Sequence, residues 1–420
     1  MKGFDLKRRW KGFLLFIAVA GPGIITSNVD NDAGGITTYS VAGAHYGYTL
    51  LWMLPLVALA LIIVQEMSAR LGVATGKGLA DLIRESMGIR ITAIIIGLML
   101  IANLANTVSE FAGVAASMEI FGVSKYVSVP LAAVGVWLLI LKANYKSVER
   151  VFLLASALYL AYVASGILAN PPWEEVGRAA VTPSFHFEAG YVAIFVTVIG
   201  TTIAPWMQFY QQASIADKGL KAADYAYERL DVIVGSLFAV LVAAFITIAC
   251  AATLHTNGVR IETAKDAALA LRPLAGSYAS TLFALGLLNA SIFSAAILPL
   301  STAYVVCEAF GWESGVSRSW KEAPVFFGLY TAFIMLGAAI ILLPIKSLIQ
   351  AMLASQTLNG VLLPVILVVM LRLVNDRRLM GRFTNGRVAN VVSYGIVAIL
   401  IALTGILLVT SVAPGVLGNG

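Results

Sequence analysis

The sequence predicts an all-α integral membrane protein. The chain has 420 residues, of which 60% are hydrophobic and only 12% charged, about half the charged fraction of a soluble domain. Its apolar residues are gathered into runs of roughly 20 residues or more, the length that a helix needs to cross a bilayer. Charged residues are concentrated between these runs. These observations together predict a polytopic protein.

The apolar runs define about eleven transmembrane spans, each ending at a charged or Pro/Gly-rich cluster. Several exceed the minimum length, so tilted or broken helices are expected. No linker separates two folded units, and residues 1–420 are therefore expected to form one transmembrane domain. The connection over 256–275 has room for a short surface helix. In chain order the spans are 12–44, 47–69, 91–121, 126–142, 149–169, 190–215, 229–255, 277–310, 323–345, 347–371 and 389–412.

The positive charges predict how the spans are oriented, because Lys and Arg are retained on the cytoplasmic side. With a cytoplasmic N-terminus, 22 of the 28 Lys and Arg fall in cytoplasmic segments and 6 fall outside. An odd number of crossings places the C-terminus outside. We expect a monomeric, multi-pass protein in the plasma membrane of a prokaryotic cell, with the lipid bilayer as its surroundings. The net charge of +6 reflects this topology and not nucleic-acid binding, which would require a basic face on a soluble module.

A weak internal symmetry divides the spans into two halves, residues 12–169 and 190–371, followed by an extra helix over 389–412. Five spans in each half give the two halves opposite topology. The first span of each half is interrupted, at TSNVDNDAGG (26–35) and at GTTIAPW (200–206). Paired interruptions in inverted repeats predict a transporter binding site, since unwound backbone is tolerated in a membrane only where it lines a cavity or binds an ion.

Asp32 is the first candidate ligand in the span 1 interruption. A carboxylate at this depth must face protein, water or a cation. The alternative is that Asp32 forms a buried ion pair, but the spans contain almost no Lys or Arg that could be its partner. Asp30 and Asn31 are expected to shape the ion path. Asp30 has two further interpretations, widening an aqueous vestibule or capping the second half-helix. Gly34 and Gly35 give the backbone the freedom that the interruption needs.

Four other spans contribute polar candidates. In span 6, Thr201 and Thr202 offer hydroxyls and freed carbonyls next to Pro205, although a threonine in a membrane helix often bonds back to its own turn. Gln356 and Asn359 in span 10 share one helix face and form a polar edge. The remaining candidates are expected at the inner exit (Gln208 and Gln211) or as buried polar residues that either function or join helices (Glu110 in span 3 and Asn289 in span 8).

The donor atoms of this constellation are oxygens. Cys250 and Cys307 lie in apolar spans and are expected to pack there without a disulfide, and the three histidines fall at outer ends of helices or in an outer loop. Met207 lies close in sequence to the span 6 interruption. Oxygen donors with one or two carboxylates suit Mg²⁺, Mn²⁺ or Ca²⁺, whereas Zn²⁺, Cu⁺ and Fe²⁺ favour imidazole or sulfur.

These motifs resemble the NRAMP family of divalent-metal transporters. The similarity is carried by GPGIITSNVDNDAGGITTYSVAGAHYGYTLLW at span 1, SEFAGVAAS at span 3, TIAPWMQFYQQAS at span 6, GLLNASIFSAA at span 8 and SQTLNGVLLP at span 10, in the family's order and over essentially the whole membrane core. The resemblance implies a LeuT-like fold with two inverted five-helix repeats (spans 1–5 and 6–10), in which spans 1 and 6 are unwound at mid-membrane.

The sequence departs from the family pattern at the site itself. The family's Asp-Pro-Gly-Asn is here Asp32-Ala-Gly-Gly35, so that Gly35 replaces an asparagine ligand. The family's Met-Pro-His is here Ala204-Pro-Trp206, which removes a thioether ligand and leaves extra volume, and Thr107 stands where the family has an aspartate. These departures resemble the branch of NRAMP-related magnesium transporters (NRMT) and weaken the expectation of proton coupling.

The resulting hypothesis is a Mg²⁺ importer that also carries Mn²⁺ by alternating access, without proton coupling. The ion would be held largely hydrated between spans 1 and 6 by Asp32, Asp30, Thr201 and Gln356, and no cofactor is expected. One alternative is a proton-coupled Mn²⁺/Fe²⁺ importer of the ordinary family type. Another is a LeuT-fold carrier of an organic solute, whose carboxylate Asp30 and Asp32 would repel. An enzyme is not expected, because no histidine lies at mid-membrane and HExxH and GxSxG patterns are lacking.

Overall fold

The computed structural model describes residues 29–142 and 156–412, and within them all regular secondary structure is helical. The all-α prediction is thereby confirmed. Eight helical segments within these residues, some composed of more than one helix, are long and apolar enough to cross a membrane, and α6 (Lys125–Lys142) is a shorter apolar helix. Those that match predicted spans are α4 (Met53–Thr75), α5 (Leu79–Ile120), the shorter α6 (Lys125–Lys142), α10 (Ala189–Thr202) with α11 (Pro205–Asp217), α12 (Tyr225–Thr253), α15 (Ala279–Phe310), α16 (Pro324–Leu342), α17 (Leu348–Val374) and α19 (Arg387–Val412).

Two predicted spans fall only partly within the described residues. Of span 12–44 the structure describes the second half, α3 (Ala33–Tyr46), and residues 12–28 lie outside. Of span 149–169 it describes a 3₁₀ turn (Ser156–Tyr159) and α8 (Leu160–Leu168). The predicted connection over 256–275 does contain short surface helices, α13 (Ala264–Ala268) and α14 (Arg272–Ala275). Two further short helices, α9 (Trp173–Val181) and α18 (Arg377–Met380), lie between predicted spans, at 170–189 and 372–388.

α5 begins twelve residues before the predicted start at 91, because its first segment is amphipathic and not uniformly apolar. Leu79, Leu82 and Ile83 are buried, whereas Arg84 lies on the surface side, the pattern of a helix that lies against protein on one face only. Gly88 then adopts φ 78° and ψ 168°, a conformation that favours glycine. The helix therefore kinks at Gly88, and its strictly apolar part follows the kink.

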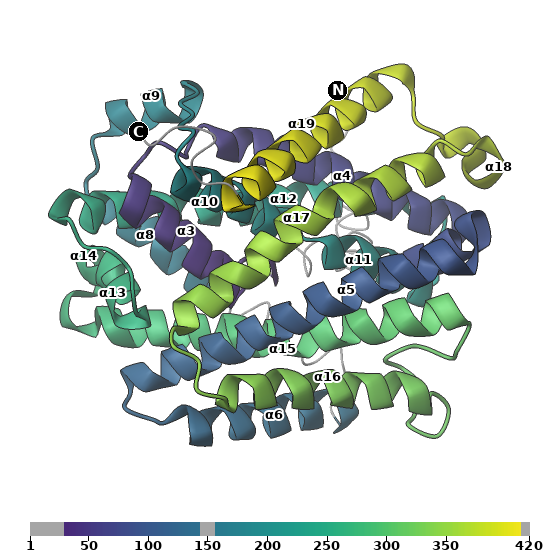
Figure 1. Ribbon diagram of the computed structural model, residues 1–420, viewed down its shortest axis with the longest axis horizontal. Helices are drawn as coiled ribbons and strands as arrows, with labels where there is room; N and C mark the ends of the chain where they lie inside the picture. The colour runs from purple at the N-terminus through teal and green to yellow at the C-terminus, as the bar shows by residue number, and fades with distance from the viewer. Residues whose placement is uncertain (1–28, 143–155, 413–420) are drawn as a thin grey trace, which may run out of the picture.

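The helices pack so that the two interrupted spans lie inside the molecule. α5 and α15 run side by side, with α16 and α6 along one side and α17 along the other (Figure 1). α12 packs against α3, α4 and α8, and α10 packs against α17 and α3. α19 contacts α10 and α17 from the periphery. This arrangement brings α3, α10 and α17 together around the interruptions.

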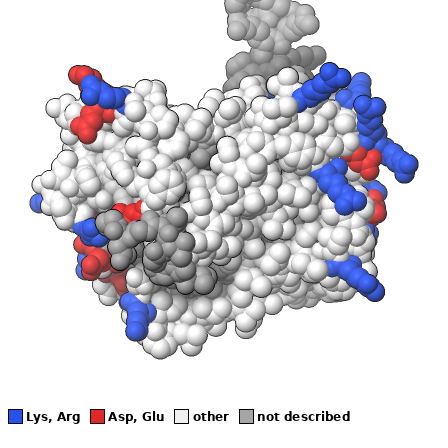
Figure 2. Space-filling model, turned by 45° about the horizontal axis from the view of Figure 1, so that its top comes forward, with Lys and Arg blue, Asp and Glu red and all other residues white. Residues whose placement is uncertain are grey.

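The surface of the molecule is apolar between its two ends. Figure 2 shows a broad band without charged side chains, and the charges gather at either end. Large apolar side chains are exposed on this surface, for example Leu131 at 69% and Met335 at 65%. An apolar surface of this extent is not stable in water and is expected to face lipid.

Candidate metal-ion site

The interruption of span 1 consists of Asn31 and Asp32. Val29 and Asp30 are helical, and α3 starts at Ala33. Asp32 has extended backbone angles (φ −70°, ψ −173°), and its Oδ1 accepts a hydrogen bond of 2.6 Å from the Gly35 amide, which is the geometry of a helix N-cap. The interpretation that Asp30 caps the second half-helix is therefore wrong: the cap is Asp32, because the chain turns after Asp30 and not before it.

Glu110 on α5 lies at the same helix end. It is fully buried, and its Oε2 accepts a 3.3 Å hydrogen bond from the Ala33 amide, while Oε1 has no hydrogen-bond partner among the described residues. Two carboxylates thus meet the N-terminus of α3, where the free amide groups and the helix dipole favour negative charge. The sequence alone left Glu110 open between function and helix joining, and the structure places it beside the interruption.

The second interruption lies between α10 and α11. Ile203 (φ −124°, ψ 63°) and Ala204 (φ −71°, ψ 138°) leave the helical region, and Pro205 begins α11. Proline has no N–H to donate to the preceding turn, and its ring excludes the residue before it from the helical conformation. The break is therefore encoded by Pro205 and falls within the predicted 200–206.

The two interruptions face each other. The hydroxyls of Tyr39 on α3 and Thr202 on α10 are 2.7 Å apart. A Cβ added to Gly35 would overlap the carbonyl oxygen of Asp30 and lie 3.3 Å from Thr201 Oγ1, so that this close approach requires glycine at position 35. Asp30, Gly35 and Thr201 are therefore neighbours across the two broken helices.

Thr201 and Thr202 differ in what they can offer to an ion. Thr202 Oγ1 donates to the carbonyl oxygen of Val198 at 2.7 Å, the back-bond that is common for threonine in helices. Thr201 Oγ1 is buried and has no partner within the described residues. Of the two predicted hydroxyl ligands, only Thr201 is left with its hydroxyl uncommitted.

Asp30 is the least satisfied polar side chain of the site. It is 2% exposed, and neither carboxylate oxygen has a hydrogen-bond partner within the described residues. A buried carboxylate without partners is costly unless a cation, a proton or water compensates it. Asn31 turns elsewhere, because its Nδ2 donates to the carbonyl oxygen of Ala239 on α12 at 3.4 Å.

α17 contributes an amide edge to the site. A Cβ on Gly34 would overlap the side chain of Gln356, so this amide lies directly against α3. Gln356 Oε1 accepts from Asn359 Nδ2 at 2.9 Å, which confirms that the two residues share a face. Asn359 also exchanges hydrogen bonds of 3.1 and 2.9 Å with Asn106 on α5. Sequence reasoning missed Asn106, although its position four residues before Glu110 places both on one face of α5.

The remaining predicted residues lie on α11 and α15. Gln208 and Gln211 are buried on α11, and their side-chain amides have no partners among the described residues, while Ser68 of α4 donates to the Gln208 carbonyl at 2.7 Å. Asn289 on α15 is half-buried with an unpartnered Nδ2. Among the described residues, the Asn289 amide nitrogen forms no hydrogen bond that would join it to the site.

The donor set near the interruptions is rich in oxygen. Among the described residues no group of three His, Cys, Asp or Glu side chains could hold a metal ion, so further ligands would have to be hydroxyl, amide, carbonyl or water oxygens. Cys250 and Cys307 are free and buried. Sequence reasoning missed one sulfur: Met352 Sδ accepts a hydrogen bond from Thr37 Oγ1 of α3 at 3.5 Å. Met352 precedes Gln356 by one turn of α17, and this spacing could have indicated that both face α3.

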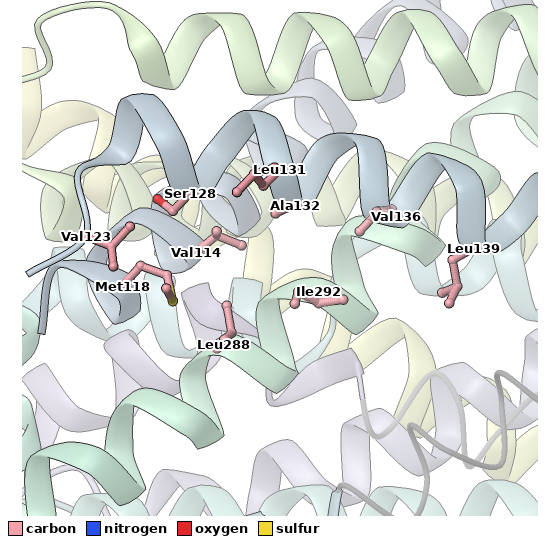
Figure 3. Close-up of a pocket in the computed structure, with 11 residues that line it drawn as sticks. Val114, Met118, Val123, Ser128, Leu131, Ala132, Val136, Leu139, Leu288 and Ile292 are labelled. Atoms are coloured by element: carbon pink, nitrogen blue, oxygen red, sulfur yellow. The ribbon is translucent and has the colours of Figure 1, made fainter. Parts of the chain in front are cut away.

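A separate cavity of about 430 Å³ lies between α5, α6 and α15. Figure 3 shows Val114, Leu131 and Ile292 among the side chains that line it, and Ser128 is the only polar one. A lining without carboxylate or amide groups cannot compensate a divalent charge. This cavity is therefore not a candidate ion site.

Comparisons with known proteins relate the whole chain to metal transporters. Residues 23–410 match the family described as natural resistance-associated macrophage protein-like. The divalent metal cation transporters MntH of Granulibacter bethesdensis and Ralstonia nicotianae are 27% and 29% identical, over 96% and 97% of this chain and 90% and 93% of theirs.

Two solved structures share the fold. The manganese transporter of Eremococcus coleocola, solved as a point mutant, aligns with a TM-score of 0.79 at 21% identity, over 99% of this chain and 90% of that one. Mhp1, a nucleobase-cation-symport-1 family transporter, aligns with a TM-score of 0.60 at 15% identity, over 93% of this chain and 91% of that one. The LeuT-like fold expected from the sequence is thereby confirmed.

Proposed function

The chain belongs to the natural resistance-associated macrophage protein-like family, and from this premise we propose that it is a membrane transporter of divalent metal cations with Mn²⁺ as a cargo. The curated relatives are named divalent metal cation transporters, and the structural neighbour is a manganese transporter. The observation that carries the proposal is the pair of facing interruptions, where Asp30 and Thr201 are buried next to Asp32 without hydrogen-bond partners in the described part of the chain.

In this proposal the cation supplies what the buried groups lack. Asp30 and Asp32 balance its charge, and Thr201 Oγ1 donates a lone pair. Gln356 Oε1 accepts a 2.9 Å hydrogen bond from Asn359. Rotation of the Gln356 amide breaks this bond and turns Oε1 toward the cation. Glu110 remains at the N-terminus of α3 and adds negative charge. An inside-negative membrane potential then favours import by about 2.3 kcal/mol per charge for each 100 mV.

Mg²⁺ is a second candidate cargo, favoured by one observation. Ala204 stands at the second interruption, with no His or Cys beside it in Ile203–Trp206 and Met207 as the next sulfur along the chain. The sulfur near the site, Met352 Sδ, already accepts a hydrogen bond from Thr37 Oγ1. The second interruption itself therefore offers no soft ligand of the kind that distinguishes transition metals from Mg²⁺. A largely hydrated ion could be held by hydrogen bonds from Asp30, Thr201 and Gln356. This is the chemistry expected of the NRMT branch, and it would need no coupled proton.

The test is cation uptake into proteoliposomes that contain the full chain. Separate dyes report Mn²⁺, Mg²⁺ and pH inside the vesicles, with and without an imposed potential, and protein-free vesicles are the control. Uptake of Mn²⁺ without Mg²⁺ supports the manganese importer, and uptake of both supports the Mg²⁺ branch. Acidification in step with the metal establishes proton coupling. Uptake of neither metal would contradict the proposed function.

A further inference from the structure

A cluster of arginines, named the arginine patch, surrounds the connection between α17 and α19. All of its guanidinium groups are exposed, and none forms an ion pair within the described residues. The one carboxylate in this stretch, Asp376, instead caps α18 by accepting a 2.8 Å hydrogen bond from the Arg378 amide. The patch consists of Arg372, Arg377, Arg378, Arg382 and Arg387.

Three other basic side chains at the same end of the molecule are paired with carboxylates. Lys77 lies 2.7 Å from Glu85, Arg84 lies 3.4 Å from Asp81, and Arg318 lies 3.2 Å from Glu313. Figure 2 shows Lys and Arg concentrated at the right-hand edge, the end at which α18 lies in Figure 1. Lys218, Lys221, Arg229 and Lys321 are exposed and, like the patch, form no ion pair within the described residues. The arginine patch differs from them in gathering five unpaired side chains, all of them arginine, in one connection.

The backbone that carries the patch is fixed against the transporter core. Asn375 and Asn390 exchange hydrogen bonds of 2.9 and 2.7 Å across the connection. Arg70 of α4 donates to the Phe383 carbonyl at 3.1 Å and to the Asn385 side chain, and Met380 is buried at 2% exposure. A ligand for the arginines would therefore find a largely pre-formed surface, which lowers the entropic cost of binding.

An apolar surface adjoins the arginines directly. Val388, Val391 and Tyr394 on the first turns of α19 are 79%, 74% and 54% exposed, and they follow Arg387 in the chain. A surface of this kind is stable only against lipid. The guanidinium groups therefore stand where hydrocarbon gives way to headgroups. A partner for both features must combine an anionic group with an apolar body.

We propose that the arginine patch binds the headgroups of anionic phospholipids in the surrounding leaflet. Guanidinium groups pair with phosphate oxygens through two parallel hydrogen bonds, which suits them better than lysine to this contact. Clusters of four or more basic residues next to a membrane helix attract anionic lipid, and each contributes about a fivefold gain in affinity. The acyl chains of the bound lipid lie along Val388 and Val391.

The experiment measures the melting temperature of the purified full chain in neutral detergent during titration with dioctanoyl-phosphatidylglycerol, dioctanoyl-phosphatidylcholine or inorganic phosphate. Ligand that binds the folded state raises the melting temperature and yields an apparent affinity. The patch variant is Arg377→Gln/Arg378→Gln. The matched control is Lys77→Gln/Arg318→Gln, which also removes two exposed positive charges, both already in ion pairs.

We expect phosphatidylglycerol to bind the wild type more tightly than phosphatidylcholine, and the patch variant to lose about fivefold in affinity per arginine. The control variant should retain wild-type affinity. Three results would each overturn the proposal. They are phosphatidylcholine binding as tightly as phosphatidylglycerol, inorganic phosphate raising the melting temperature as much as phosphatidylglycerol, and phosphatidylglycerol binding the patch variant as tightly as the wild type. The measurement involves no transport, so its result is independent of the proposed cargo.

Discussion

At the scale of single residues, Asp32 combines a structural and an electrostatic role. Its Oδ1 holds the first turn of α3 through the Gly35 amide. Its charge lies next to the buried carboxylate of Asp30, which has no hydrogen-bond partner in the ranges that the structure describes. Asparagine is as good an N-cap as aspartate but carries no charge. The two roles can therefore be separated by substitution.

We predict that Asp32→Asn and Asp32→Ala both abolish metal uptake, whereas only Asp32→Ala destabilises the fold. The alanine variant loses the cap, which costs about 1 kcal/mol, and the asparagine variant keeps it. Proteoliposome uptake and the melting temperature of each variant check this expectation. Uptake by Asp32→Asn at the wild-type rate would show that the charge of Asp32 is not needed.

Ala204 is expected to set the preference between metals. The substitution Ala204→Met adds a thioether at the second interruption, and a soft ligand favours Mn²⁺ over Mg²⁺. We expect the ratio of Mn²⁺ to Mg²⁺ uptake to rise by about tenfold, equivalent to about 1.4 kcal/mol. Ala204→Leu, which fills similar volume without sulfur, is the control and should lower both rates without changing their ratio. An unchanged ratio in Ala204→Met would contradict the assignment.

At the scale of elements, the site depends on how closely α10 and α17 approach each other. A Cβ on Gly200 would overlap the Gln356 carbonyl and the backbone of Gly360, and one on Gly360 would overlap the Val196 carbonyl. The backbones of α10 and α17 are therefore in direct contact. Small residues such as glycine allow membrane helices to approach this closely. This contact places the Gln356 amide beside α3.

Gly200→Ala should therefore separate the two helices. We expect it to lower the melting temperature, in line with a cost of about 1–3 kcal/mol for overpacking, and to reduce uptake. Gly97→Ala is the matched control, because a Cβ at that position of α5 meets nothing within 4 Å and alanine favours helix by about 1 kcal/mol. A melting temperature of Gly200→Ala at or above that of Gly97→Ala would exclude the close packing.

At the scale of the whole molecule, the two ends of the helix bundle differ in charge. The apolar band in Figure 2 separates an end dominated by Lys and Arg from an end of mixed charge. The basic end contains α18, and the opposite end contains α9, α13 and α14 (Figure 1). The orientation expected from the sequence assigns the basic end to the cytoplasm, and this assignment stays a prediction.

Cysteine labelling tests the orientation, since the native Cys250 and Cys307 are buried and should give little background. Thr182→Cys lies in the exposed connection after α9, and Ser317→Cys lies in the exposed connection between α15 and α16. A membrane-impermeant maleimide should label Thr182→Cys on intact cells and Ser317→Cys only after permeabilisation. The reverse pattern would invert the topology.

The sequence by itself determined the number and position of most membrane helices, because long apolar spans and interruptions by Asp32 and Pro205 are local properties of the chain. It also placed Gln356 and Asn359 on one face. It failed at the first segment of α5, whose amphipathic pattern with Arg84 is mistaken for a loop when only uniform hydrophobicity is counted.

Only the tertiary structure decided which polar groups remain uncommitted. Thr201 and Thr202 are adjacent and chemically identical, yet the Thr202 hydroxyl bonds to Tyr39 and Val198 while the Thr201 hydroxyl has no partner within residues 29–142 and 156–412. Whether Asn106 or Met352 approaches the site likewise depends on helices distant in sequence. Hydrogen bonds between separate helices follow from their relative placement, which no local pattern of residues specifies.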